Sequence, residues 1–268
     1  MKRTLTLITT LCLLLSLLAI GASAQKNHTI VTVTIAVKGE LVATQVSVPV
    51  EDIDGDGTFT INDALYCAHE QVYEGGANAG YSSYTSEYGL SMSKLWGDES
   101  GAYGYYLNNA SCTSLADPVK NGDCVTAFVY ASADWSDVYT YFDVSEKTVE
   151  LGEEVTLTLM AAGYDENWNP ITYPVAGATI IVDGARTGIV TDANGQATFK
   201  QNVIGTAVIS ATSTEQTLVP PACKLTVVAY EQEATTDAAK ASGCKAIAGS
   251  ALVLVSLGAV AMIKRKEK

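Results

Sequence analysis

A twelve-residue segment, 52–63, has the composition and spacing of a site for a hard divalent cation. Aspartates occupy its first, third, fifth and twelfth positions, and a glycine occupies its sixth. Alternate residues of a tight loop turn their oxygens inward, the glycine permits a left-handed backbone, and the last carboxylate closes the site from the following helix. The ligands predicted by this spacing are the side chains of Asp52, Asp54, Asp56 and Asp63 and the backbone carbonyl of Thr58.

Calcium is the cation that we expect in this loop, since the loop offers more oxygens than the octahedral shell of magnesium needs. Asp63 is one methylene shorter than the glutamate that usually closes such a site, and a Kd on the order of 10⁻⁴ M would still suffice outside a cell. The alternative is an acidic loop followed by a helix cap, because Thr60 and Asp63 have the spacing of a capping box. That alternative leaves three neighbouring carboxylates uncompensated, so the spacing favours a structural calcium.

The elements that position this loop follow from hydrophobic periodicity. Apolar residues alternate with polar ones over 29–37 and again over 42–50, which predicts two half-buried strands joined as a hairpin. After the loop, apolar residues from Ile61 to Val72 follow the spacing of an amphipathic helix. Segments 103–107 and 124–130 are predicted as later strands. The order predicts an α+β domain in which one helix covers a sheet.

The following part of the chain carries only strand signals. Short alternating segments separated by Gly, Asp and Asn turns predict a β-sandwich. The predicted strands are 155–159, 179–182, 188–190, 197–200, 207–211 and 225–228.

Both ends of the chain have the character of export and anchoring segments. Residues 1–24 combine a basic start, an apolar run and an Ala-x-Ala site, which predicts a cleaved signal peptide. Residues 246–263 carry no charge and would span roughly 27 Å as a helix, and the basic tail 264–268 follows them. Basic residues stay on the cytoplasmic side. We therefore expect a single-pass protein of the cell membrane, with its body outside a Gram-positive bacterium.

Between these ends we expect two domains, 25–143 and 144–230, and a flexible polar spacer over 231–245. Residues 25–245 hold ten basic and 28 acidic side chains, a formal net charge of −18. Such a surface disfavours nucleic acid and anionic lipid as partners. The exported part contains an odd number of cysteines, and Cys112 with Cys124, which flank a turn-rich stretch, are the predicted disulfide.

Two family resemblances agree with this division. The opening hairpin, the run Thr60-x-x-Asp63-Ala64-Leu65, Trp96 with the run 105–109, and the closing stretch 119–125 resemble the bacterial surface domain related to the β-grasp C-terminal domain of transcobalamin. That resemblance implies a β-grasp fold, and the vertebrate members bind cobalamin. The acidic loop departs from the family pattern and is similar to half of a dockerin repeat, an EF-hand-like calcium loop, with no second copy.

The second resemblance covers 145–229. The runs 175–179, 191–197 and 205–211 resemble bacterial immunoglobulin-like surface domains. Such domains serve as spacers or adhesive modules, and the resemblance implies the sandwich architecture without indicating a ligand.

Eleven of the 14 tyrosines lie within 66–141. Trp96, Tyr105 and Tyr106 are therefore candidates for a surface that stacks on a saccharide or a corrinoid, and the alternative is that the rings pack over the open face of a small sheet.

No catalytic constellation stands out in the sequence. There is no Gly-x-Ser-x-Gly and no glycine-rich phosphate loop, and His69 lacks the second histidine of a zinc-protease helix, which predicts a surface or interface histidine. We expect a non-enzymatic surface protein with a structural calcium, acting in adhesion or interaction with an extracellular protein or saccharide; the alternative is a surface capture protein for a small ligand.

Overall fold

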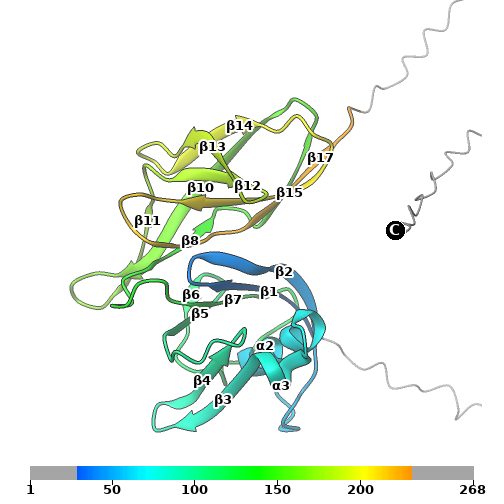
Figure 1. Cartoon of the computed structure of the whole chain (residues 1–268), viewed down its shortest axis with the longest axis vertical. Coiled ribbons are helices and arrows are strands. Elements are labelled where there is room, and N and C mark those ends of the chain that lie inside the picture. Colours follow the sequence, from blue (N-terminus) through cyan, green and yellow to red (C-terminus); the bar gives the residue numbers. More distant parts are fainter. Residues whose placement is uncertain (1–28, 231–268) are drawn as a thin grey trace, which may run out of the picture. The chain divides into compact units, whose positions relative to one another are not determined.

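The computed structural model describes residues 29–230, most of which lie in strands (Figure 1). The predicted signal peptide, spacer, membrane helix and basic tail lie outside these residues. Within the described part of the chain, no helix is long and apolar enough to cross a membrane. The described residues all belong to one compact unit.

The first half begins with the predicted hairpin, β1 (Thr29–Val37) and β2 (Glu40–Val50), which pair in antiparallel register. The acidic loop leads from β2 into α2 (Ile61–Val72), as the apolar periodicity predicts. The sheet is completed by β7 (Cys124–Val129), which runs parallel to β1. The remaining elements are α3 (Gly76–Gly80), β3 (Tyr81–Ser86), β4 (Gly89–Leu95), β5 (Tyr103–Leu107) and β6 (Ala110–Ser111).

Helix α2 covers one face of this five-stranded sheet, whose order is β2-β1-β7-β5-β6 (Figure 1). Val33 and Ile35 of β1 pack against Ile61 and Leu65 of α2, and all four side chains are buried. Val72, at the end of the predicted apolar stripe, is exposed because the helix ends there. The separate hairpin β3–β4, which the periodicity does not predict, adds Tyr81 and Leu95 to the same core.

The second half is a two-sheet sandwich. One sheet has the order β11-β10-β8-β16, with β14 also paired to β10, and the other has the order β13-β12-β15-β17-β9. The strands are β8 (Val138–Phe142), β9 (Glu146–Glu150), β10 (Glu154–Tyr164), β11 (Pro170–Pro174), β12 (Thr179–Val182), β13 (Ala185–Val190), β14 (Gln196–Lys200), β15 (Gly205–Thr212), β16 (Leu218–Val219) and β17 (Cys223–Val228).

Alternation along β10 explains the core of this sandwich. Leu157 and Leu159 are fully buried, whereas Thr156 and Thr158 between them are partly exposed. They meet Ile180, Ile209 and Leu225 of the other sheet in one cluster. Strand β8 precedes the expected boundary at residue 143 but pairs with β10, so the sandwich begins at Val138.

The two halves share a small apolar junction. Ala36 and Phe128, from the face of the first sheet opposite α2, pack with Tyr139 and Val219. The Tyr139 ring stacks on the Tyr106 ring with centroids 3.6 Å apart and planes 5° apart. This contact places an aromatic layer between the first sheet and the start of the sandwich.

Candidate metal centre between β2 and α2

The acidic loop is organised chiefly by Asp52. Its Oδ1 atom accepts hydrogen bonds from the backbone N–H of Gly55 (2.8 Å) and of Asp56 (3.2 Å), and its Oδ2 atom accepts one from Gly57 (2.8 Å). Gly55 and Gly57 have φ of 76° and 87°, a conformation that favours glycine. The local sequence therefore closes the loop around one carboxylate.

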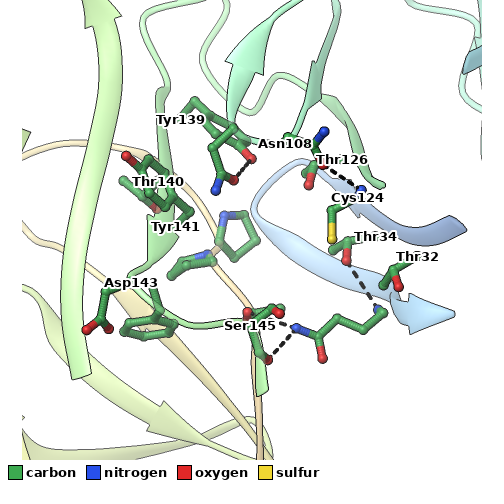
Figure 2. Close-up of a pocket in the computed structure, with 16 residues that line it drawn as sticks. Thr32, Thr34, Asn108, Cys124, Thr126, Tyr139, Thr140, Tyr141, Asp143 and Ser145 are labelled. Carbon is green, nitrogen blue, oxygen red and sulfur yellow. Dashed lines mark hydrogen bonds between the residues drawn. The ribbon is translucent and has the colours of Figure 1, made fainter. Parts of the chain in front are cut away.

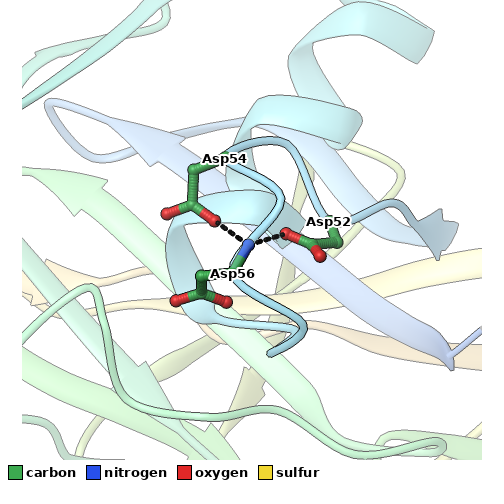
Figure 3. A group of neighbouring side chains, drawn as sticks. All are labelled: Asp52, Asp54 and Asp56. Carbon is green, nitrogen blue, oxygen red and sulfur yellow. Dashed lines mark hydrogen bonds between the residues drawn. The ribbon is translucent and has the colours of Figure 1, made fainter.

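Three of the predicted ligands meet in this loop. Each of Asp52, Asp54 and Asp56 offers a carboxylate oxygen, and these oxygens lie within 4.8 Å of one another. Figure 3 shows the three side chains grouped around the Asp56 backbone nitrogen, which donates to both Asp52 and Asp54. The cluster lies at the surface, since Asp54 and Asp56 are exposed. Exposed acidic groups of this kind also occur without a metal ion.

The pKa shifts differ between neighbouring members of the cluster. The pKa of Asp52 is lowered, mainly by the hydrogen bond from the Gly57 amide and also by the other backbone amides, which outweigh desolvation. The pKa of Asp54 is raised: the Asp56 amide lowers it, but desolvation and the charges of Asp56 and Asp63 together outweigh that hydrogen bond. Backbone amides thus stabilise the charged form of Asp52, whereas desolvation and repulsion from Asp56 and Asp63 destabilise the charged form of Asp54. A bound cation would relieve that repulsion, so the donor set fits a hard oxygen-binding ion.

Asp63, the predicted closing ligand, lies outside the three-carboxylate cluster. Its Oδ2 atom accepts from the backbone N–H (2.9 Å) and the hydroxyl (2.6 Å) of Thr60, and its Oδ1 atom accepts from the backbone N–H of Ile53 (3.1 Å). The Thr60 hydroxyl oxygen in turn accepts from the Asp63 backbone N–H (3.3 Å). This is the capping box weighed as the alternative, so Asp63 fixes the start of α2 and ties the loop to it. Thr58 donates its backbone N–H to Asp56 Oδ1.

The structure does not bring the three candidate ring residues together on one surface. Trp96 packs on His69 and Tyr73, with ring centroids 5.4 and 4.9 Å away. Tyr105 packs against the core beneath α2, whereas Tyr106, its neighbour on β5, faces the junction. Alternation along the strand separates the two tyrosines.

The prediction of a surface or interface position for His69 is wrong, because the side chain is fully buried. Nδ1 is 2.7 Å from the Leu65 carbonyl oxygen, and Nε2 is 3.2 Å from the Trp96 backbone nitrogen, which donates to it. Nδ1 therefore carries the proton of a neutral ring. Burial lowers the pKa of His69, against the effect of the Leu65 carbonyl.

The predicted disulfide between Cys112 and Cys124 is not formed: Cys67, Cys112, Cys124 and Cys223 are free thiols in the described part of the chain. Cys112 packs against the core beneath α2. Cys124 lines a cavity on the other side of the sheet. The sheet itself therefore lies between the two thiols.

That cavity, of about 260 Å³, is a feature that sequence reasoning missed (Figure 2). Thr32, Thr34 and Thr126 of the first half face Tyr139 and Ser145 across it. Buried Gln45 also lines it and donates from Nε2 to the carbonyl oxygens of Ser145 (2.7 Å) and Ala222 (3.2 Å). The polar side of β1 is its signal in the sequence, because Tyr139 and Ser145, which face β1 across the cavity, are more than 100 positions from that strand.

Comparisons with known proteins give little beyond this geometry. No family model matches the chain. No curated protein matches it either. Among solved structures, the N-terminal four immunoglobulin domains of Dscam1 isoforms 4.44 and 8.4 are similar at 13% and 14% identity, each with a TM-score of 0.23.

The alignments cover 77% of this chain and 45% and 46% of those chains, so this chain spans less than half of their length. The class of structure that strand pairing defines here is a mostly β protein with a two-sheet sandwich following a helix-covered sheet.

Proposed function

We propose that this protein is a non-enzymatic interaction module of a cell surface, with a structural calcium in the loop before α2. The observation that carries the calcium proposal is the convergence of Asp52, Asp54 and Asp56 at the point where β2 passes into α2. The order hairpin, helix and parallel β1–β7 pair supports a β-grasp assignment for the first half. The sandwich would act as the immunoglobulin-like stalk, tethered through the predicted membrane helix 246–263.

Calcium would act on the loop through charge and geometry. The ion would neutralise the carboxylates of Asp54 and Asp56, each of which accepts one backbone N–H, whereas Asp52 accepts three. Because the Asp63 carboxylate already joins the loop at Ile53 to the helix cap at Thr60, ordering the loop would also hold α2 on the sheet. The role is structural, and no reaction step is assigned to the ion.

Thermal unfolding of the full-length chain tests the calcium proposal. With 10 mM calcium in place of a chelator, the Tm should rise by about 5–10 °C if the Kd is on the order of 10⁻⁴ M. Magnesium at the same concentration should give a smaller rise. Asp54→Ala should abolish most of the calcium-dependent rise.

Glu87→Ala is the matched control, because Glu87 is an exposed acid in the turn between β3 and β4, away from the loop. It should retain the full response to calcium. A wild-type Tm that does not change with calcium, or an equal response in Asp54→Ala and wild type, would refute the site.

The surface location is tested separately. Intact Gram-positive cells that express the full chain should display residues 29–230 to an added antibody without permeabilisation. Labelling that requires permeabilised cells would overturn the proposed orientation, whatever the outcome for calcium.

Capture of a small ligand, such as a corrinoid or a saccharide, is the second candidate function. Its predicted surface, Trp96 with Tyr105 and Tyr106, is divided among different packing environments. A capture site therefore needs other aromatic residues, and two of the exposed ones, Tyr164 and Trp168, lie together where β10 turns into β11.

A further inference from the structure

Two exposed tryptophans lie at the same end of one sheet. Trp135 is in the loop that leads into β8, and Trp168 is in the turn that joins β10 to β11. Strands β8 and β10 are antiparallel, with Tyr139 opposite Ala162, so the start of β8 and the end of β10 share an end of the sheet. Trp135 is 61% exposed and Trp168 is 80% exposed. Such exposure of the largest apolar side chains marks a candidate contact surface.

Both tryptophans occupy a backbone conformation that a bulky residue rarely adopts. Trp135 has φ of 61° and Trp168 has φ of 63°. In each turn the tryptophan N–H donates to the carbonyl three residues earlier, Ser132 at 3.1 Å and Asp165 at 3.0 Å. Asparagine or glycine would satisfy this geometry with less strain, so the local fold does not account for a large ring at either position.

The turn of Trp168 is also firmly held. The Asp165 carboxylate accepts from the backbone N–H of Asn167 and of Asn169, each at 2.8 Å, and from Asn169 Nδ2 at 2.9 Å. The Trp168 ring lies 6.0 Å from the Tyr164 ring, centroid to centroid, with planes inclined by 50°. A fixed turn thus presents a pair of exposed rings, which lowers the entropy cost of binding.

A groove of about 340 Å³ begins beside this pair. Its wall includes the Tyr106 and Tyr164 rings, Ile171, and the exposed polar side chains of Asn109, Ser111 and Thr172. None of the residues that line it carries a charge, although the described chain is strongly acidic. Its volume falls at the lower end of the range for small-ligand sites.

We infer that the β10–β11 hairpin and this groove bind a neutral saccharide chain. A pyranose has an apolar face of C–H groups, which packs on an aromatic ring, and a rim of hydroxyls, which bonds to amide and hydroxyl side chains. The rings of Tyr164 and Trp168 match the first property, and Asn109, Ser111 and Thr172 match the second. The uncharged lining matches a ligand without charge. The inference rests on the proposed function of a surface module and names its partner.

Affinity electrophoresis of the full-length chain in native gels tests this inference. The probes are three neutral polysaccharides: glucomannan, galactomannan and hydroxyethyl cellulose. At least one should retard the wild-type chain, and Trp168→Ala and Tyr164→Ala should each weaken that retardation at least tenfold. Tyr88→Ala is the matched control, since Tyr88 is 83% exposed at the tip of another hairpin, and it should migrate as wild type does.

Loss of binding in Trp168→Ala with an unchanged Tm supports the inference, because the ring is exposed and its loss should not unfold the chain. Absence of retardation by all three polysaccharides overturns it, as does equal retardation of Trp168→Ala and wild type. Binding of a decaproline peptide at Trp168, without saccharide binding, also overturns it and assigns the rings to a polyproline helix. The calcium response involves different residues, so failure here leaves that proposal standing.

Discussion

The three clustered aspartates have different roles, although the sequence presents them as equivalent ligands. Asp52 supports the loop through three backbone amides, whereas Asp54 accepts one. In a chelator, Asp52→Ala should therefore lower the Tm by a few degrees, and Asp54→Ala should leave it equal to or above that of wild type because repulsion is relieved. Scanning calorimetry of both variants, with and without calcium, measures this. An equal decrease in Tm for both variants in the presence of a chelator would contradict the different roles assigned to Asp52 and Asp54.

His69 should make stability depend on pH in a defined window. Its folded pKa lies below the ordinary value of 6.5, so the unfolded chain binds a proton more readily. The contribution of the buried neutral ring to the free energy of unfolding is fully present above about pH 6.5 and is lost as the pH falls below that value. His69→Gln, which keeps a neutral acceptor, should be less stable at pH 7.5 but should lose little more between pH 7 and 5.5.

Urea unfolding at a series of pH values measures this dependence. Asp98 does not contribute to the pH dependence in this window. Partial desolvation would raise its pKa, but the hydrogen bond and charge of Lys38 and the hydrogen bonds of Ser100 lower the pKa to about 2. Its contribution is therefore present above about pH 4 and lost only toward pH 2. The same pH slope in His69→Gln and wild type would show that another group controls this window.

The sequence contains a signal for the burial of His69 that composition alone does not reveal. Ile61, Leu65 and His69 are spaced by four residues, so they share one face of α2, and the first two are core residues. The aspartate spacing likewise predicts the carboxylate cluster. It cannot distinguish a closing ligand from a cap, because Asp63 satisfies both patterns until the bonds to Thr60 and Ile53 are known.

Among the elements, α2 depends on the cap that connects it to the acidic loop. Thr60→Ala removes the side-chain acceptor for the Asp63 N–H and should cost about 1 kcal/mol, which corresponds to about 2–4 °C in Tm for a chain of this size. Thr60→Ser keeps the hydroxyl and should remain within about 0.5 kcal/mol of wild type. Thermal and urea unfolding compare the two. A loss in the serine variant as large as in the alanine variant would instead implicate the buried methyl group of Thr60.

Element prediction succeeds where one face of a strand is buried. Segment 29–37 matches β1 because its buried residues Val31, Val33 and Ile35 alternate with threonines. Element prediction fails for β3, in which serine, threonine and tyrosine occupy both faces, and for β11, in which every residue is exposed. It also misses β4, although Leu90 and Met92 alternate there with Ser91 and Ser93. These strands form by pairing as hairpins with the adjacent strand, β3 with β4 and β11 with β10, and a pairing of this kind does not need one buried face on each strand.

In the whole molecule, the aromatic junction couples the two halves. The sequence indicates rings that could cover an open sheet, and Tyr106 and Phe128 do so. The ring that completes the layer is Tyr139, which belongs to a strand of the sandwich. Polar links accompany it, including the Lys224 ammonium, which donates to the Gln45 carbonyl oxygen at 2.7 Å. The packing of the first sheet on the sandwich cannot be predicted from the sequence of either half alone, because the packed face of each half would be exposed without the other half.

Loss of the Tyr139 ring should weaken this coupling. The side chain is buried, stacks on Tyr106 and donates its hydroxyl to Asn109 Oδ1 at 2.9 Å, so Tyr139→Ala should cost about 3–5 kcal/mol. Wild type should unfold in one calorimetric transition, and the variant should show two, one for each core. Tyr139→Phe keeps the stack and should cost about 1 kcal/mol without dividing the transition. Tyr84→Ala, an exposed ring away from the junction, is the control. A single transition in Tyr139→Ala, with equal calorimetric and van't Hoff enthalpies, would contradict this prediction. It would mean that the remaining contacts between the halves are enough to make the two cores unfold cooperatively.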